Sequence, residues 1–231
     1  MATIQVNSLV SRAATLIQDA TNVRWPTNEL IDWLNDGQRE IVLIKPQASV
    51  KNESVSLTTG STKQSIPASG VQLIDVTRNM GSAGNTPGDS IRVVSREVLD
   101  AQRPSWHSDV NADGKIKHYM FDPRDPKTFY VYPKAPATAH YVEVIYSASP
   151  TDASAGGVIQ IDDIYANALL DYILYRAYSK DAEYAGNAQL AVAHYQAFSN
   201  SLGAKTQNEL SQNPNLSVAG FNPNVPGSAK V

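Results

Sequence analysis

The sequence feature that most constrains this fold is the stretch Ile161–Leu202, which predicts two helices joined near Tyr184–Asn187. The first helix begins at Asp162 or Asp163, because a carboxylate suits a helix N-terminus as cap and dipole partner. Its apolar and aromatic residues lie on nearly every face: Ile164, Tyr165, Ala168, Leu169, Leu170, Tyr172, Ile173, Leu174, Tyr175, Ala177 and Tyr178. Such a helix must be covered on several sides. Either a single-chain core or neighbouring copies of the protein cover it.

The second helix of this stretch has one apolar face. Ala191, Tyr195, Phe198 and Leu202 recur at helical spacing. Gly203 follows where a C-terminal stop is expected, so the helix is predicted to end there.

Two further helices are predicted before residue 46. Val6–Asp19 carries one apolar face, and the segment after Trp25 has Thr27 as a candidate N-cap. Pro46 prevents the second helix from continuing. Gly37, in its middle, costs roughly 1 kcal/mol against alanine. Such a glycine suggests the close approach of another helix.

After Pro46 the hydrophobic period changes from helix to strand. Residues 50–68 alternate and turn at Thr59-Gly60, which predicts a hairpin, and five further short strands follow before residue 148. We expect a small sandwich or partly open barrel inserted between helices. The predicted fold class is therefore α+β, a helical bundle with an inserted β domain. The predicted domains are 1–48 (helical, first part), 49–157 (β-rich), 158–205 (helical, second part) and 206–231 (extended tail).

Composition limits the classes of function. Charged residues make up 18 %, which is low for a free surface and favours an assembled protein. The net charge of −3 gives no basic footprint for nucleic acid. Cysteine is absent, which fits folding in a reducing compartment. We expect no secretory signal, and no apolar run reaches the ~18 residues that a membrane-spanning helix needs.

The search for chemistry predicts no catalytic, cofactor or metal residues. The histidines are scattered and no nucleophile elbow occurs. The carboxylate pairs Asp162/Asp163 and Asp122/Asp125 are better explained as caps and turns than as a glycosidase pair. Asp109–Gly114 matches the first half of an EF-hand loop, but Met120 stands where the bidentate acid belongs. A turn is the preferred interpretation there.

The segment Thr206–Val231 is rich in Asn, Pro, Ser and Gly and shows no period. It is predicted to be a solvated tail, or a segment that orders on a partner. Its anchors in the second case are Leu216, Val218, Phe221 and Val225.

Two segments of the chain resemble a known family. WPTNELIDWLNDGQREIVLIKPQA (Trp25–Ala48) and YILYRAYSKDAEYAGNAQLAVAHYQAFSNSLG (Tyr172–Gly203), about a quarter of the chain, are similar to the head-to-tail adaptor proteins of short-tailed bacteriophages, the tail-tubular-A-like connectors. The order helix, helix, β insertion, helix, helix and loose C-terminus also agrees with that family.

The resemblance implies a structural, non-enzymatic protein of the virion neck, made in the host cytoplasm. It implies a homo-oligomeric ring, typically dodecameric, beneath the portal protein and above a downstream tail or nozzle protein. DNA would pass through the lumen without tight binding. The family motifs carry no residue-level contact over to this chain. From their apolarity in this sequence, we expect Leu216, Val218, Phe221 and Val225 to make the portal contact. For the same reason we expect Leu169, Tyr172 and Tyr175 of the crowded helix at the interface between subunits.

One alternative from another class stays open at this point. The chain could be a virion-associated enzyme or a carbohydrate-binding β module with a helical oligomerisation arm. A pocket with converging titratable groups would favour that alternative.

Overall fold

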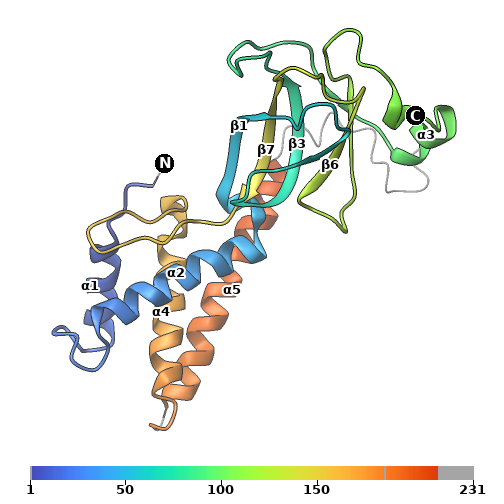
Figure 1. Cartoon of the computed structure of the whole chain (residues 1–231). Helices are drawn as coiled ribbons and strands as arrows, with labels where there is room; N and C mark the ends of the chain where they lie inside the picture. Colours follow the sequence, from blue (N-terminus) through green and yellow to red (C-terminus); the bar gives the residue numbers. More distant parts are fainter. Residues whose placement is uncertain (1, 185, 213–231) are drawn as a thin grey trace. The chain divides into compact units, whose positions relative to one another are not determined.

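The computed structural model describes residues 2–184 and 186–212, and these residues form two compact units (Figure 1). The helical unit contains the chain up to Lys45 and from Asp152 on. The β unit is the continuous segment Pro46–Thr151. The fold is α+β as predicted, with N- and C-terminal helices that pack together and two small sheets between them in the sequence.

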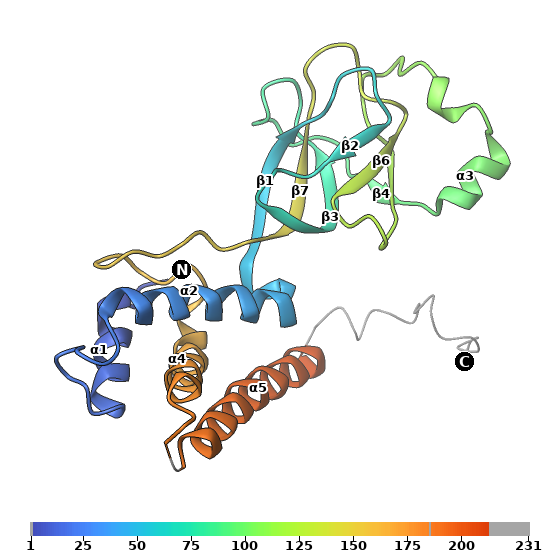
Figure 2. The same cartoon turned by 60° about the horizontal axis from the view of Figure 1, so that its bottom comes forward.

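The helical unit is built around its fourth helix. Its elements are α1 (Val6–Leu16), α2 (Thr27–Ile44), the 3-10 turn η3 (Asp163–Tyr165), α4 (Ala166–Lys180) and α5 (Asn187–Gln212). Helix α4 packs against α1, α2 and α5. Both views place α4 between α1 and α5 (Figures 1 and 2). The two helices predicted in residues 161–202 are confirmed.

The nearly uniform apolarity of α4 has its cause in this central position. Eight of its side chains are buried: Ala166, Ala168, Leu169, Leu170, Tyr172, Ile173, Leu174 and Ala177. Each large one contributes roughly 1.5–3 kcal/mol relative to an exposed position. Three helices of the same chain therefore account for the pattern, and the single-chain explanation of the two suffices for most of this helix.

Gly37 lies where α2 meets α4. A Cβ atom at this position would lie 2.9 Å from Cδ1 of Tyr172 and 3.2 Å from Cδ2 of Leu169. The close approach of another helix, predicted from the sequence, is confirmed. The two helices pack this tightly because position 37 carries no side chain.

We therefore expect Gly37→Ala to destabilise the protein although alanine is the better helix former. Overpacking costs about 1–3 kcal/mol and the gain in helix propensity returns about 1 kcal/mol, so the net loss is up to about 2 kcal/mol. Gly203→Ala is the matched control, because nothing lies within 4 Å of a Cβ there. Thermal unfolding should show a lower melting temperature for Gly37→Ala and an equal or higher one for Gly203→Ala. A higher value for both variants would contradict the packing argument.

Helix α5 continues through Gly203 and ends at Gln212, so the predicted stop at Gly203 is wrong. Glycine costs only about 1 kcal/mol inside a helix, and the next residues, AKTQNEL, are mostly good helix formers. Pro214 is the first proline after this point. The predicted extended tail is corrected for residues 206–212, and its remainder, 213–231, lies outside the described residues.

The helix starts follow the predicted chemistry in part. Asp162 caps η3, because its Oδ1 accepts a hydrogen bond from the Ile164 amide at 3.1 Å. Asp163 instead accepts from the Thr3 amide at 2.8 Å and fixes the start of the chain. Thr27 makes no side-chain capping bond, so that prediction is wrong. The connection before α2 is held by Asp19, whose carboxylate accepts three backbone amides and has a lowered pKa as a result.

The β unit contains two small sheets around one core. Its strands are β1 (Val50–Ser56), β2 (Lys63–Ser65), β3 (Gly70–Asn79), β4 (Arg92–Val93), β5 (His118–Phe121), β6 (Thr128–Tyr132) and β7 (Tyr141–Ala148). The sheet orders are β1-β7-β3 and β2-β6-β5-β4. The short helices η1 (Pro46–Ser49), α3 (Arg96–Gln102) and η2 (Trp106–Ser108) complete the unit. Apolar side chains from both sheets meet in the shared core. The two sheets are also linked near β3 and β4, where the Ile91 amide donates to Thr77 O at 2.9 Å.

The predicted hairpin over residues 50–68 is wrong. A turn does form, with Gly60 at φ 68°, but β1 pairs with β7 and β2 pairs with β6. The two strands therefore belong to different sheets. Strand β7 supplies β1 with a register of seven residue pairs.

Candidate functional site

A groove beside α3 is the first place in the β unit to examine for chemistry. It has a volume of about 580 Å³ and is lined by residues 93–97, Asp100, residues 120–124 and Tyr130. Two of its three carboxylates, those of Asp100 and Asp122, are paired. Arg124 forms a two-pronged contact with Asp122 at 3.0 and 2.6 Å and lowers the pKa of that acid to about 2. Asp100 accepts from Trp106 Nε1 at 2.7 Å.

A pair of carboxylates for acid–base catalysis needs one member with a pKa near the working pH. Asp122 is shifted in the opposite direction, and Asp162 and Asp163 are used as backbone acceptors. Asp122 and Asp162 stabilise local turns, and Asp163 binds the N-terminal segment at Thr3. The groove therefore does not favour the enzyme alternative.

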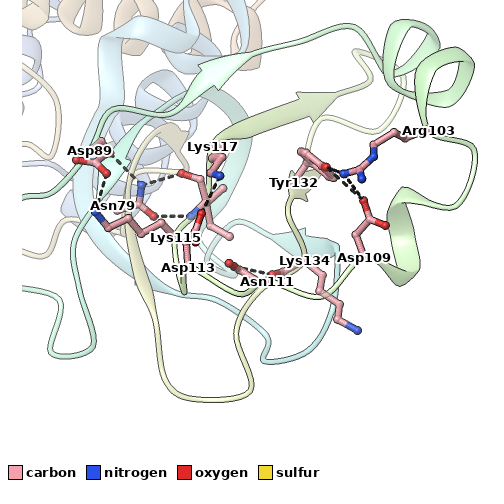
Figure 3. A network of polar contacts seen from close by, with 11 residues as sticks. Asn79, Asp89, Arg103, Asp109, Asn111, Asp113, Lys115, Lys117, Tyr132 and Lys134 are labelled. Atoms are coloured by element: carbon pink, nitrogen blue, oxygen red, sulfur yellow. Dashed lines mark hydrogen bonds and ion pairs between the residues drawn. The ribbon is translucent and has the colours of Figure 1, made fainter.

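In the loop Asp109–Gly114 the two aspartates form ion pairs with basic side chains (Figure 3). Asp109 Oδ2 lies 3.0 Å from Arg103 Nη1, and Asp113 Oδ2 lies 2.8 Å from Lys117 Nζ. Asn111 Nδ2 donates to Lys134 O at 3.0 Å. Met120, at the twelfth position of the EF-hand-like string, is buried in a small cluster with Leu99 and Trp106. Among residues 2–184 and 186–212, no group of three or more His, Cys, Asp or Glu residues gathers at one point.

We expect calcium to leave the stability of the protein unchanged. A ligand that binds only the native state must raise its stability, but here the acids are neutralised by Arg103 and Lys117. Thermal unfolding should give the same melting temperature with millimolar calcium and with EDTA. A rise of several degrees with calcium, lost in the variant Asp113→Asn, would contradict this.

Asn79 is the centre of a second, buried network in the β unit (Figure 3). Its Nδ2 donates to the carbonyls of Asp89 and Ile116 at 2.9 and 2.8 Å, and its Oδ1 accepts from the Ile116 amide at 2.9 Å. His140 Nε2 lies 2.8 Å from the same Oδ1. An amide oxygen can only accept, so Nε2 donates. Burial lowers the pKa of His140 and favours the neutral ring.

This network predicts a loss of stability at mildly acidic pH. The unfolded chain binds a proton at His140 near pH 6.5, and the folded chain binds it at a lower pH because the folded pKa is lowered. The contribution is complete above pH 6.5 and is lost as the pH falls through the folded pKa. Urea unfolding at several pH values between about 5.5 and 7.5 should show this slope, and His140→Gln should flatten it. An unchanged slope in that variant would exclude His140 as the cause.

The three residues predicted for the subunit interface lie in or beside the core of the helical unit. Leu169 is fully buried and Tyr172 nearly so, and the Tyr172 ring lies 5.2 Å from the Phe198 ring of α5. Tyr175 is half-buried, with its ring 5.0 Å from that of Tyr195. Leu169 and Tyr172 are thus covered by their own chain. Any contact with another copy must use side chains that stay exposed on these helices.

The helical unit also has an apolar groove that was not among the sites predicted from the sequence. It lies between α4 and α5, has a volume of about 380 Å³, and is lined by Tyr175, Ser179, Ala182, Ala188, Ala191, Val192, Tyr195 and Gln196. The sequence signal was the lack of Asp, Glu, Lys and Arg from Tyr184 to Ala204. The predicted portal-binding residues Leu216, Val218, Phe221 and Val225 lie outside the described residues.

The chain is thus a helical unit interrupted by a β unit, in which Asp109, Asp113 and Asp122 are held in ion pairs. A family model described as SU10 adaptor protein matches residues 4–219, nearly the whole chain, and the chain belongs to this family of phage structural adaptors. No curated protein sequence matches the chain. In the part of the chain that the structure describes, no helix has the length and apolarity to cross a lipid bilayer.

Proposed function

We propose that this chain is a head-to-tail adaptor of a phage particle. Identical subunits form a closed, dodecameric ring beneath the portal protein and join it to a downstream tail or nozzle protein. The observation that carries the proposal is the family match over residues 4–219, which spans both the helical and the β unit. A match to one unit alone would leave room for an enzyme fused to an assembly arm.

The physical character of the two units supports a structural role without catalysis. The helical unit has its own core around α4, so it keeps its shape before and after assembly. The carboxylates of the β unit examined above are bound to arginine, lysine or backbone groups. The role of the protein towards the genome would be to let the DNA pass through the lumen of the ring.

The proposed lumen binds DNA weakly. The subunit carries a net charge of −3, and dense Lys/Arg contacts with phosphate would hold a duplex in place by counterion release. A passing genome needs a wall along which it slides. The residues Leu216, Val218, Phe221 and Val225 are proposed to anchor the C-terminal segment in the portal, and the β unit to face the next tail protein.

Deletion of residues 213–231 tests the portal contact. We expect the truncated subunit to keep its helical circular dichroism signal, because the deletion removes nothing of the cores described above, yet to fail to attach to portal-bearing heads. Co-sedimentation with heads measures attachment, with the full-length chain as the positive control.

A second variant separates the anchors from mere length. Replacing Leu216, Val218, Phe221 and Val225 together by serine keeps the segment but removes its apolar side chains, and we expect the same loss. Normal attachment of both variants would remove the C-terminal segment from the mechanism. Failure of the full-length chain to attach to heads would overturn the adaptor proposal itself.

A further inference from the structure

Helix α5 presents a long surface without formal charge. From Tyr184 to Ala204 the sequence contains no Asp, Glu, Lys or Arg. The apolar face of the helix, Ala191, Phe198 and Leu202, is buried within the helical unit. Most of the other side chains from Ala188 to Gly203 are exposed, and they are alanine, serine, asparagine, glutamine and single apolar residues. Free protein surfaces carry many charges, whereas the cores of protein interfaces are depleted of them.

Apolar side chains lie within this uncharged surface. Val192 is 57 % exposed, Leu190 44 % and Tyr195 41 %. Val192 and Tyr195 also line the groove of about 380 Å³ between α4 and α5. An apolar groove inside an uncharged face favours an apolar side chain from a partner whose surface is also uncharged.

Helix α1 supplies such a surface on the same chain. Its exposed side chains are Asn7, Ser8, Ser11, Arg12, Thr15 and Leu16. Arg12 is the single charged residue of the helix, and its Nη2 lies 3.4 Å from Asn167 Oδ1. Leu16 is 53 % exposed and is the large apolar side chain of this face. By contrast, α2 carries Glu29, Asp32, Asp36, Arg39 and Glu40.

The α5 face and the α1 face, which carries Arg12 as its one charge, lie on opposite sides of the helical unit. Helix α4 separates α1 from α5 in both views (Figures 1 and 2). The buried side of α1 is turned towards its own unit, so its exposed side is directed away from α5. A head-to-tail contact between identical subunits requires two different faces of this kind, and it gives a ring when the rotation from one subunit to the next closes.

Leu16 on α1 and the groove between α4 and α5 also lie near the same end of the helical unit. Leu16 is the last residue of α1, and the groove lies beside the connection between α4 and α5. Arg24, in the connection that follows α1, contacts the connection between α4 and α5. Its guanidinium pairs with Asp181 at 2.5 Å and lies 4.7 Å from the centre of the Tyr184 ring. Leu16 of one subunit and the groove of the next therefore lie near the same end of the helical unit.

We propose that the exposed face of α5 is the docking surface for a second copy of this chain, which places the exposed face of its α1 there with Leu16 over the groove. This inference rests on the proposed ring and names the two faces that form it. The side chains that make the contact are the exposed Val192, Leu190 and Leu16, and not the buried Leu169 and Tyr172.

Cysteine cross-linking tests the contact directly, because the natural chain contains no cysteine. Leu16→Cys and Val192→Cys are made singly and together, bound to portal-bearing heads as full-length chains, and treated with a short bis-maleimide. We expect the double variant to give a ladder of covalent oligomers on a denaturing gel, because each subunit offers one thiol to each neighbour. Each single variant should stay largely monomeric. Ser11→Cys with Gln196→Cys is a second pair on the same faces, used if the first pair fails to attach.

The outcomes separate this inference from the adaptor proposal. Efficient dimers of Val192→Cys alone would mean that α5 meets α5, which overturns the inference. Normal attachment of a double variant without a ladder would also overturn it and leave the adaptor function intact. If the wild-type chain does not attach to heads, the adaptor proposal fails and this inference fails with it.

Charge variants give an independent measurement. Val192→Glu and Leu16→Glu should each reduce attachment at least tenfold, because each places an unpaired carboxylate in an uncharged contact. Val98→Glu, on the exposed side of α3 in the β unit, is the matched control and should attach as the wild type does. Circular dichroism checks that all three variants fold. Unimpaired attachment of both test variants would contradict the proposed faces.

Discussion

The helical unit depends on the close approach of α2 to α4 at Gly37. The space that a methyl group would occupy there is filled by the rings and methyls of Tyr172 and Leu169. This contact puts α4 in the centre, where α1 and α5 cover its remaining sides. The same central position leaves the outer faces of α1 and α5 exposed. The lack of a side chain at Gly37 thus permits the close α2–α4 contact within the helical unit.

The sequence predicted the helices well because their hydrophobic period is local. The apolarity of α4, the capping role of Asp162 and the packing role of Gly37 can each be derived from a few neighbouring residues. Strand pairing could not be derived in this way. The turn at Gly60 is real, yet β1 joins β7, whose partner residues lie about ninety positions later. A local pattern predicts that a segment is a strand, but which strand it pairs with depends on how the whole core packs.

The candidate sites show the same division between pattern and geometry. Asp109–Gly114 has the spacing of half a calcium loop, but its acids pair with Arg103 and Lys117. The spacing of residues within a motif does not reveal such partners from outside the motif. Apolarity predicted that Leu169 would be covered, and the structure shows that its own chain covers it. Apolarity alone does not distinguish a core from an interface, because both remove the same side chains from water.

Charge makes the distinction that apolarity cannot make. A core is buried in the free subunit, whereas the centre of an interface is exposed there and is depleted of charged residues. Helix α5 meets both conditions over about five turns, and α1 meets them with Arg12 as its one exception. Helix α2, which carries both signs of charge, does not. Because the two faces lie on opposite sides of α4, the proposed contact between α1 and α5 would repeat from one copy to the next, as a ring requires.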